Sequence, residues 1–65
     1  MRLDKRKVRI ALALKDLRRV DIIRQHGIPA GTLSFALAEN AIGRGTAERI
    51  AQAIGVPLAT IAKDE

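Results

Sequence analysis

The chain has 65 residues, which is enough for one domain with a small hydrophobic core. It contains no cysteine and one histidine, His26, which excludes disulfides and thiolate zinc sites and argues against a histidine-based metal site. No apolar run approaches the length of a membrane span, and the apolar stretch after the basic N-terminus lacks a signal-peptide pattern. We therefore expect one cytoplasmic domain over residues 1–65, with no cofactor, metal, small-molecule ligand or membrane contact.

The net charge of +5 is unevenly distributed along the chain. Residues 1–26 contain nine Lys and Arg against three Asp, a balance of +6, whereas residues 27–65 contain three Lys and Arg against four Asp and Glu, a balance of −1. A domain with its positive charge gathered in one part suits a polyanion, nucleic acid first and an acidic membrane surface second. A solvated basic arm is the alternative interpretation.

Apolar residues recur at helical spacing between turn residues, which predicts five short helices and no strand. The first helix is predicted over residues 4–15, with Asp4 as its N-cap. Residues 1–7 are expected to form a basic N-terminal arm or first turn. The side of this helix expected to face the core holds Leu3, Ile10, Leu14 and Leu17.

The second helix is predicted over residues 19–26 and the third over residues 30–39. Gly27 ends the second helix, because glycine adopts the left-handed conformation at little cost, and Pro29 suits the first turn of the third. The inward-facing residues are expected to be Val20, Ile22, Ile23 and His26, then Ile28, then Leu33, Ala36, Leu37 and Asn40. The outward side of the third helix holds Gly31, Ser34, Phe35 and Ala38.

A loop over residues 40–45 precedes the fourth helix, predicted over residues 47–54 with Thr46 as its N-cap. Gly55 ends this helix, and a last helix is predicted over residues 57–62. The inward side of the fourth helix is expected to hold Ala47, Ile50, Ala51 and Ile54. The expected fold is all-α, a compact bundle of four to five helices that contains a helix-turn-helix.

Two segments carry a resemblance to a known family. Residues 23–34 (IRQHGIPAGTLS) resemble the helix-turn-helix of the Cro/CI-type (XRE) repressors, and residues 46–58 (TAERIAQAIGVPL) resemble the helix that follows it there and in the LacI-type headpiece. The resemblance implies a lambda-repressor-like fold, a homodimer and a roughly palindromic DNA operator. It also implies a nucleoid-associated transcriptional regulator, a dimeric repressor of a phage or mobile-element operon that controls its own expression in some cases.

The chain departs from the family pattern at the start of the second helix. The family usually has a serine or threonine cap followed by glutamine there, where this chain has Arg18 and Arg19. Two cations oppose the dipole at a helix N-terminus, so their presence hints at a role. The resemblance implies that this helix start touches the DNA backbone, and we therefore interpret them as phosphate contacts; two exposed arginines without a partner are the alternative interpretation. Ile23 also stands where the family usually has alanine.

The resemblance places the third helix in the DNA major groove, although that helix contains no cation. Most of the affinity is therefore expected from phosphates, and much of the specificity from DNA shape. The expected base contacts are Ala30, Gly31, Thr32, Ser34 and Phe35. The expected phosphate contacts are Lys5, Arg6, Lys7, Arg18, Arg19, Asn40, Arg44 and Thr46.

Three questions stay open at this stage. Phe35, the one aromatic residue, is interpreted as a core side chain, a partner contact or a DNA contact. The last helix supplies the candidate dimer interface, Leu58, Ile61 and Ala62. The alternative function is a protein-interaction module that docks a partner on its apolar third or last helix. We do not expect an enzyme, because the sequence lacks paired carboxylates, a Cys/His arrangement and a phosphate-binding glycine loop.

Overall fold

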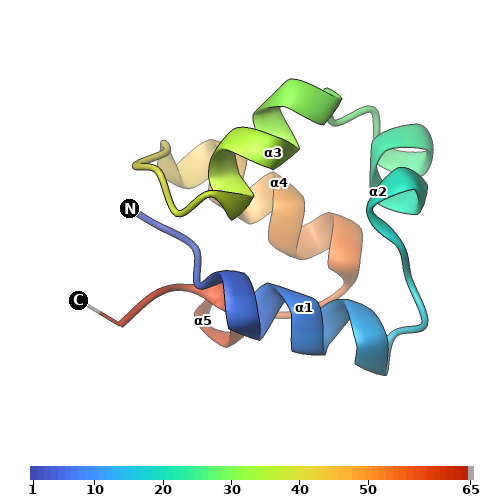
Figure 1. Ribbon diagram of the computed structural model, residues 1–65, viewed down its shortest axis with the longest axis horizontal. Coiled ribbons are helices and arrows are strands. Elements are labelled where there is room, and N and C mark those ends of the chain that lie inside the picture. The colour runs from blue at the N-terminus through green and yellow to red at the C-terminus, as the bar shows by residue number, and fades with distance from the viewer. Residues whose placement is uncertain (65) are drawn as a thin grey trace.

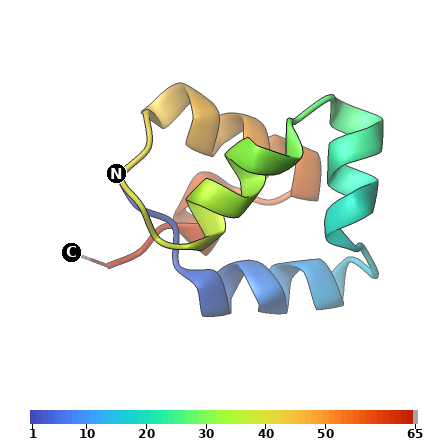
Figure 2. The same ribbon diagram turned by 45° about the horizontal axis from the view of Figure 1, so that its top comes forward.

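The structure is a computed structural model that describes residues 1–64, so Glu65, the last residue of the predicted domain, lies outside the described residues. The helices are α1 (Lys5–Leu14), α2 (Arg19–His26), α3 (Ala30–Leu37), α4 (Arg44–Ile54) and α5 (Leu58–Ile61). In Figure 1, α1 lies beside α5 while α3 passes in front of α4. Figure 2 shows α3 leaving the end of α2 in a new direction. The predicted all-α helical bundle is confirmed.

Local signals set the ends of three helices as predicted. The Asp4 carboxylate accepts a hydrogen bond from the Lys7 backbone N–H at 3.0 Å, which caps α1. Gly27 and Gly55 end α2 and α4 with φ of +64° and +88°, in the left-handed region that costs other residues roughly 1–2 kcal/mol. None of the helices over residues 1–64 is long and apolar enough to cross a membrane.

The predicted core-facing side of α1 is wrong in part. Ile10 and Leu14 are 54% and 80% exposed, while Val8 and Leu12 are buried together with Ala11. The sequence carries two apolar stripes on this helix, and α1 buries the one that includes the small Ala11. The buried core as a whole consists of Leu3, Val8, Ala11, Leu12, Ile22, Ile28, Leu33, Ala36, Leu37, Ala47, Ile50, Ala51, Ala53, Ile54 and Ile61.

Helix boundaries differ most at α4, which begins at Arg44 rather than at residue 47. Gly43 is its N-cap, so Thr46 lies inside the helix and the predicted Thr46 cap is wrong. α3 ends at Leu37, which leaves Asn40 exposed beyond the helix rather than facing inward. His26 is likewise exposed.

The N-terminal residues are tied to the domain by backbone hydrogen bonds. Met1 exchanges two bonds with Ile42, its amino group donating at 2.9 Å and its carbonyl accepting at 2.8 Å. Leu3 forms an isolated antiparallel bridge with Ala62. Residues 5–7 form the first turn of α1, so their backbone is helical.

Candidate nucleic-acid interface

The helix-turn-helix consists of α2, the Gly27 turn and α3. Ile28 follows the turn and is 3% exposed, and Leu33 of α3 is 1% exposed. These two side chains, with the partly buried Ile23, anchor both helices in the same core. The sequence therefore fixes which side of α3 faces inward, and Figure 2 shows α3 lying across the front of the domain.

The outward side of α3 is uncharged and exposed, as predicted. Gly31, Ser34 and Ala38 are exposed, and Phe35 is 53% exposed, so its interpretation as a core side chain is wrong. Apart from its chain neighbours and the backbone of its own helix, no heavy atom of residues 1–64 lies within 4 Å of the position that a Cβ on Gly31 would occupy. Ala30 and Gly31, at the start of the helix, are both exposed.

Two arginines stand at the start of α2, beside this face. The Arg18 backbone N–H donates to the Asp21 carboxylate at 2.8 Å, which offsets part of the unfavourable charge at the helix start. The Arg18 guanidinium also lies 3.8 Å from that carboxylate. Arg19 is exposed and its Nη2 lies 3.5 Å from the Ser34 hydroxyl oxygen, at the outward side of α3.

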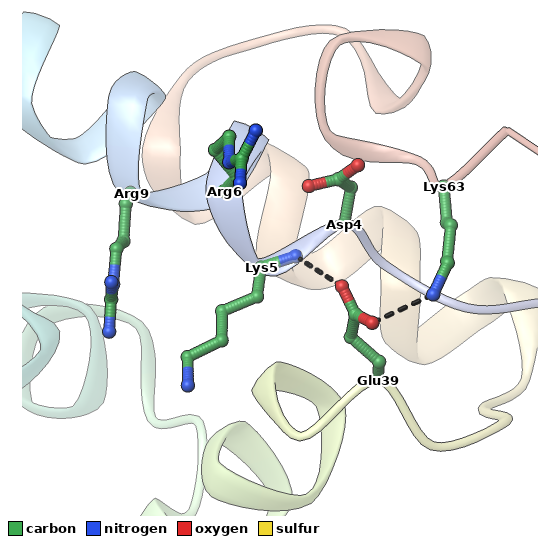
Figure 3. A pocket seen from close by; sticks show the side chains of 6 residues that line it. All are labelled: Asp4, Lys5, Arg6, Arg9, Glu39 and Lys63. Atoms are coloured by element: carbon green, nitrogen blue, oxygen red, sulfur yellow. Dashed lines mark hydrogen bonds and ion pairs between the residues drawn. The ribbon is translucent and has the colours of Figure 1, made fainter.

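A hollow of about 450 Å³ brings further cations to the C-terminal end of α3, where Glu39 follows the helix. Its lining residues are Asp4, Lys5, Arg6, Arg9, Glu39 and Lys63. Figure 3 shows Lys5 and Arg9 extending in the same direction from α1, as residues four apart on one helix do. Within residues 1–64, the side chains of Lys5, Arg6 and Arg9 form no ion pair.

The carboxylate of Glu39 is fully engaged inside this hollow. It accepts hydrogen bonds from Lys63 Nζ at 2.7 Å and from the Lys5 backbone N–H at 3.1 Å, as Figure 3 shows. The bond from Lys63, followed by the backbone bond from Lys5, lowers the pKa of Glu39 below its ordinary value. Because the lining holds four cations against two carboxylates, the net charge that the hollow presents to a ligand is positive.

Three of the expected phosphate contacts, Asn40, Arg44 and Thr46, have different surroundings in the fold. The Asn40 side chain donates to the Phe35 carbonyl at 3.0 Å and so caps α3. Arg44 pairs with Glu48 at 3.1 Å. Thr46 instead lines a hollow of about 160 Å³ beside the Gly27 turn, with Ile28, Pro29, Thr32, Arg49 and Ile50.

Lys7 and the last helix also differ from expectation. Lys7 Nζ contacts the Ala62 carbonyl and the Asp64 carboxylate, both at 3.2 Å, which places it away from Lys5 and Arg9. Ile61 is fully buried in its own chain, so its assignment to a dimer interface is wrong. Leu58 and Ala62 are half-buried.

Sequence reasoning missed Arg9, Lys63 and Arg49. The four-residue spacing of Lys5 and Arg9 was a usable signal, since it puts both side chains on one face of a helix. No sequence signal placed Lys63 beside Glu39, because that contact joins segments 24 residues apart.

Comparison of the chain with protein-family models, with curated proteins and with solved structures finds no match. Membership of the Cro/CI-type repressors therefore stays a prediction from the resemblance of the helix-turn-helix and of the helix after it.

Proposed function

We propose that this domain binds double-stranded DNA, with α3 in the major groove. The observation that carries the proposal is the uncharged, exposed side of α3, which has Arg19 beside Ser34 in its middle and Lys5 and Arg9 near its C-terminal end. Cations on either side of a small-residue helix suit a duplex, whose phosphates border the groove that the helix enters.

In this proposal the phosphate contacts come from two elements. Arg19 of α2 binds one phosphate, and the hollow at the N-terminus of α1 binds another through Lys5 and Arg9. These side chains are exposed and form no ion pair within residues 1–64, so a phosphate does not have to displace a carboxylate. Arg18 and Arg44 contribute less, because each already lies beside a carboxylate.

In this proposal only a few side chains of α3 contact the bases. Ser34 and Thr32 supply hydroxyls that donate to or accept from base edges, and Ala30 and Phe35 supply apolar contact for a thymine methyl group. The absence of a side chain at Gly31 lets the backbone of α3 approach the base pairs closely. DNA shape supplies the rest of the specificity.

The biological role that we propose is that of a transcriptional regulator, most simply a repressor that occupies its operator. The resemblance to Cro/CI-type repressors supports a homodimer, a palindromic site, a phage or mobile-element operon and a cytoplasmic, nucleoid-associated location. Leu58 and Ala62 remain the candidate dimer residues, because a hollow of about 460 Å³ adjoins them and the exposed Met1. We propose no catalytic activity and no cofactor.

The experiment measures binding of a fluorescent duplex of random sequence to the domain, by fluorescence anisotropy at low salt. We expect a dissociation constant tighter than about 10⁻⁴ M, the weak end of non-specific DNA binding. Failure to bind any duplex at that level would sink the proposal.

Phe35 favours one second candidate, a protein-interaction module. An exposed aromatic side chain on a solvent-facing helix suits a protein partner as well as a thymine. The two candidates differ in one variant: Phe35→Ala leaves affinity for random DNA within about twofold if phosphates dominate binding. A domain that binds no duplex but loses a partner on this substitution would be an interaction module.

A further inference from the structure

An apolar groove lies on the side of α1 that the core does not use. Ile10 and Leu14 are four residues apart and are 54% and 80% exposed. Together with Ala11 and Val56 they line a groove of about 150 Å³ between α1 and the segment that leads into α5. Lys7 and Lys15 are also among its lining residues. Two large aliphatic side chains exposed side by side on one helix point to an interaction surface.

The groove lies away from the proposed DNA interface. Successive residues of an α-helix are rotated by about 100°, so Leu14 lies about 180° round α1 from Lys5, and Ile10 about 100° from Arg9. Lys5 and Arg9 line the hollow near α3, whereas Ile10 and Leu14 line the groove near α5. A ligand in the groove therefore leaves the cations of the hollow free.

We propose that this groove binds an acidic amphipathic helix of another protein. Such a helix places apolar side chains three and four residues apart into an apolar groove, and its charged face meets the rim. The rim here is basic, because Lys7 and Lys15 line the groove. Asp64, which pairs with Lys7, is 96% exposed, so a partner's carboxylate can replace it at little cost.

Charge also argues against a second copy of this chain as the occupant. A two-fold dimer uses the same patch on both subunits, so Lys7 and Lys15 of one copy would face the same cations of the other. Like charges brought together across an interface oppose association. An acidic segment gains from the same arrangement.

The test uses the full chain and a fluorescein-labelled helical peptide of Glu, Ala and Leu, with leucines three and four residues apart on one face. Binding is followed by anisotropy at low salt. We expect the peptide to bind, and Leu14→Ser to weaken binding about tenfold, the equivalent of about 1.4 kcal/mol. Phe35→Ser is the matched control: it removes an exposed apolar side chain from α3 and should leave the peptide affinity unchanged. A peptide with Lys in place of Glu should bind at least tenfold more weakly.

Equal binding of the acidic and basic peptides, or equal binding by the wild type and Leu14→Ser, would overturn the proposal. So would sedimentation that shows a dimer in the wild type and a monomer in Leu14→Ser, because the occupant would then be a second copy. Co-sedimentation with phosphatidylglycerol vesicles that Leu14→Ser abolishes, without peptide binding, would assign the groove to a membrane surface. Because Leu14 is mostly exposed, the variant should keep the wild-type melting temperature. Its affinity for DNA should also be unchanged, which separates this proposal from the proposed DNA binding.

Discussion

The guanidinium Nη2 of Arg19 lies 3.5 Å from the hydroxyl oxygen of Ser34, so the first residue of α2 reaches the outward face of α3. A guanidinium and a hydroxyl thus lie side by side on two different helices, and we propose the first as a phosphate contact and the second as a base contact. At this distance the hydrogen bond is weak, and the arginine is free to turn toward a ligand.

Replacing Arg19 by alanine should weaken binding to specific and to random duplexes by about the same factor, because a phosphate contact carries no sequence information. The slope of log K against log salt should become shallower by about 0.9, the value for one phosphate. Anisotropy titrations at several salt concentrations measure both quantities.

The matched control for this variant is Arg24→Ala. Arg24 is also an exposed arginine of α2, but it lies about 140° round the helix from Arg19. Arg24→Ala should change the slope of log K against log salt little. Equal effects of the two substitutions would mean that net charge, and not the position of Arg19, determines affinity.

Substitution of Ser34 or Thr32 should instead change which sequence is preferred. Hydroxyls that contact base edges discriminate between base pairs, and one mismatched pair costs roughly 1–3 kcal/mol. Selection of bound sequences from a random duplex pool, with the wild type and Ser34→Ala in parallel, reads this out. The same consensus from both proteins would remove Ser34 from base readout.

Gly31→Ala should separate stability from binding. In the first turn of α3 the added Cβ meets no heavy atom within 4 Å, and alanine is a better helix former, so unfolding should become harder by about 0.5 kcal/mol. If the backbone of α3 lies close to the base pairs, the same methyl group should weaken DNA binding. Thermal unfolding and anisotropy of one sample give both values.

Gly27→Ala is the companion variant. It should destabilise the domain by roughly 1 kcal/mol, because φ of +64° is strained for alanine although the space is open. A Gly31→Ala protein that is more stable and binds DNA as tightly as the wild type would contradict close approach at this position.

Glu39→Gln should make stability less dependent on pH in the acid range. The pKa of Glu39 is lowered in the fold, so its carboxylate adds stability above the unfolded value of about 4.3, and that stability is lost as the pH falls through the lower, folded value. The wild type should be more stable than the variant at pH 6. The difference in stability should shrink toward zero as the pH falls below the folded pKa of Glu39. Urea unfolding at a series of pH values measures it.

Lys63→Gln should reproduce much of this effect, because the Lys63 bond is the largest cause of the shift. A stability difference between the wild type and Glu39→Gln that persists unchanged at the lowest pH would show that the carboxylate's charge is not its source.

Features of the fold that depend on neighbouring residues were predictable from the sequence, whereas features that depend on distant contacts were not. Asp4, Gly27 and Gly55 act on their own backbone neighbourhood, and each ends or begins a helix where the sequence predicts. The buried side of α1 is harder to predict, because Ile10 and Leu14 form a second apolar stripe beside the buried one. Spacing alone does not show which of the two stripes faces the core.

The candidate site also has one part that the sequence predicts and one part that it does not. The uncharged outward face of α3 follows from helical periodicity and from the buried Leu33. The hollow does not follow from periodicity, because Glu39 and Lys63 meet only after the chain has folded back along α1. Thr46 was misplaced because the sequence around Gly43 and Gly45 resembles a loop, while α4 extends through it.

The salt dependence of duplex binding tests the central claim most directly. With one phosphate at Arg19 and one at the α1 hollow, log K should fall linearly with log salt, with a slope of about −2 or steeper for each domain bound. Lys5→Ala combined with Arg9→Ala should bring the slope closer to zero while the domain stays folded, since both side chains are exposed. A slope near zero in the wild type, or no duplex binding at low salt, would contradict the account.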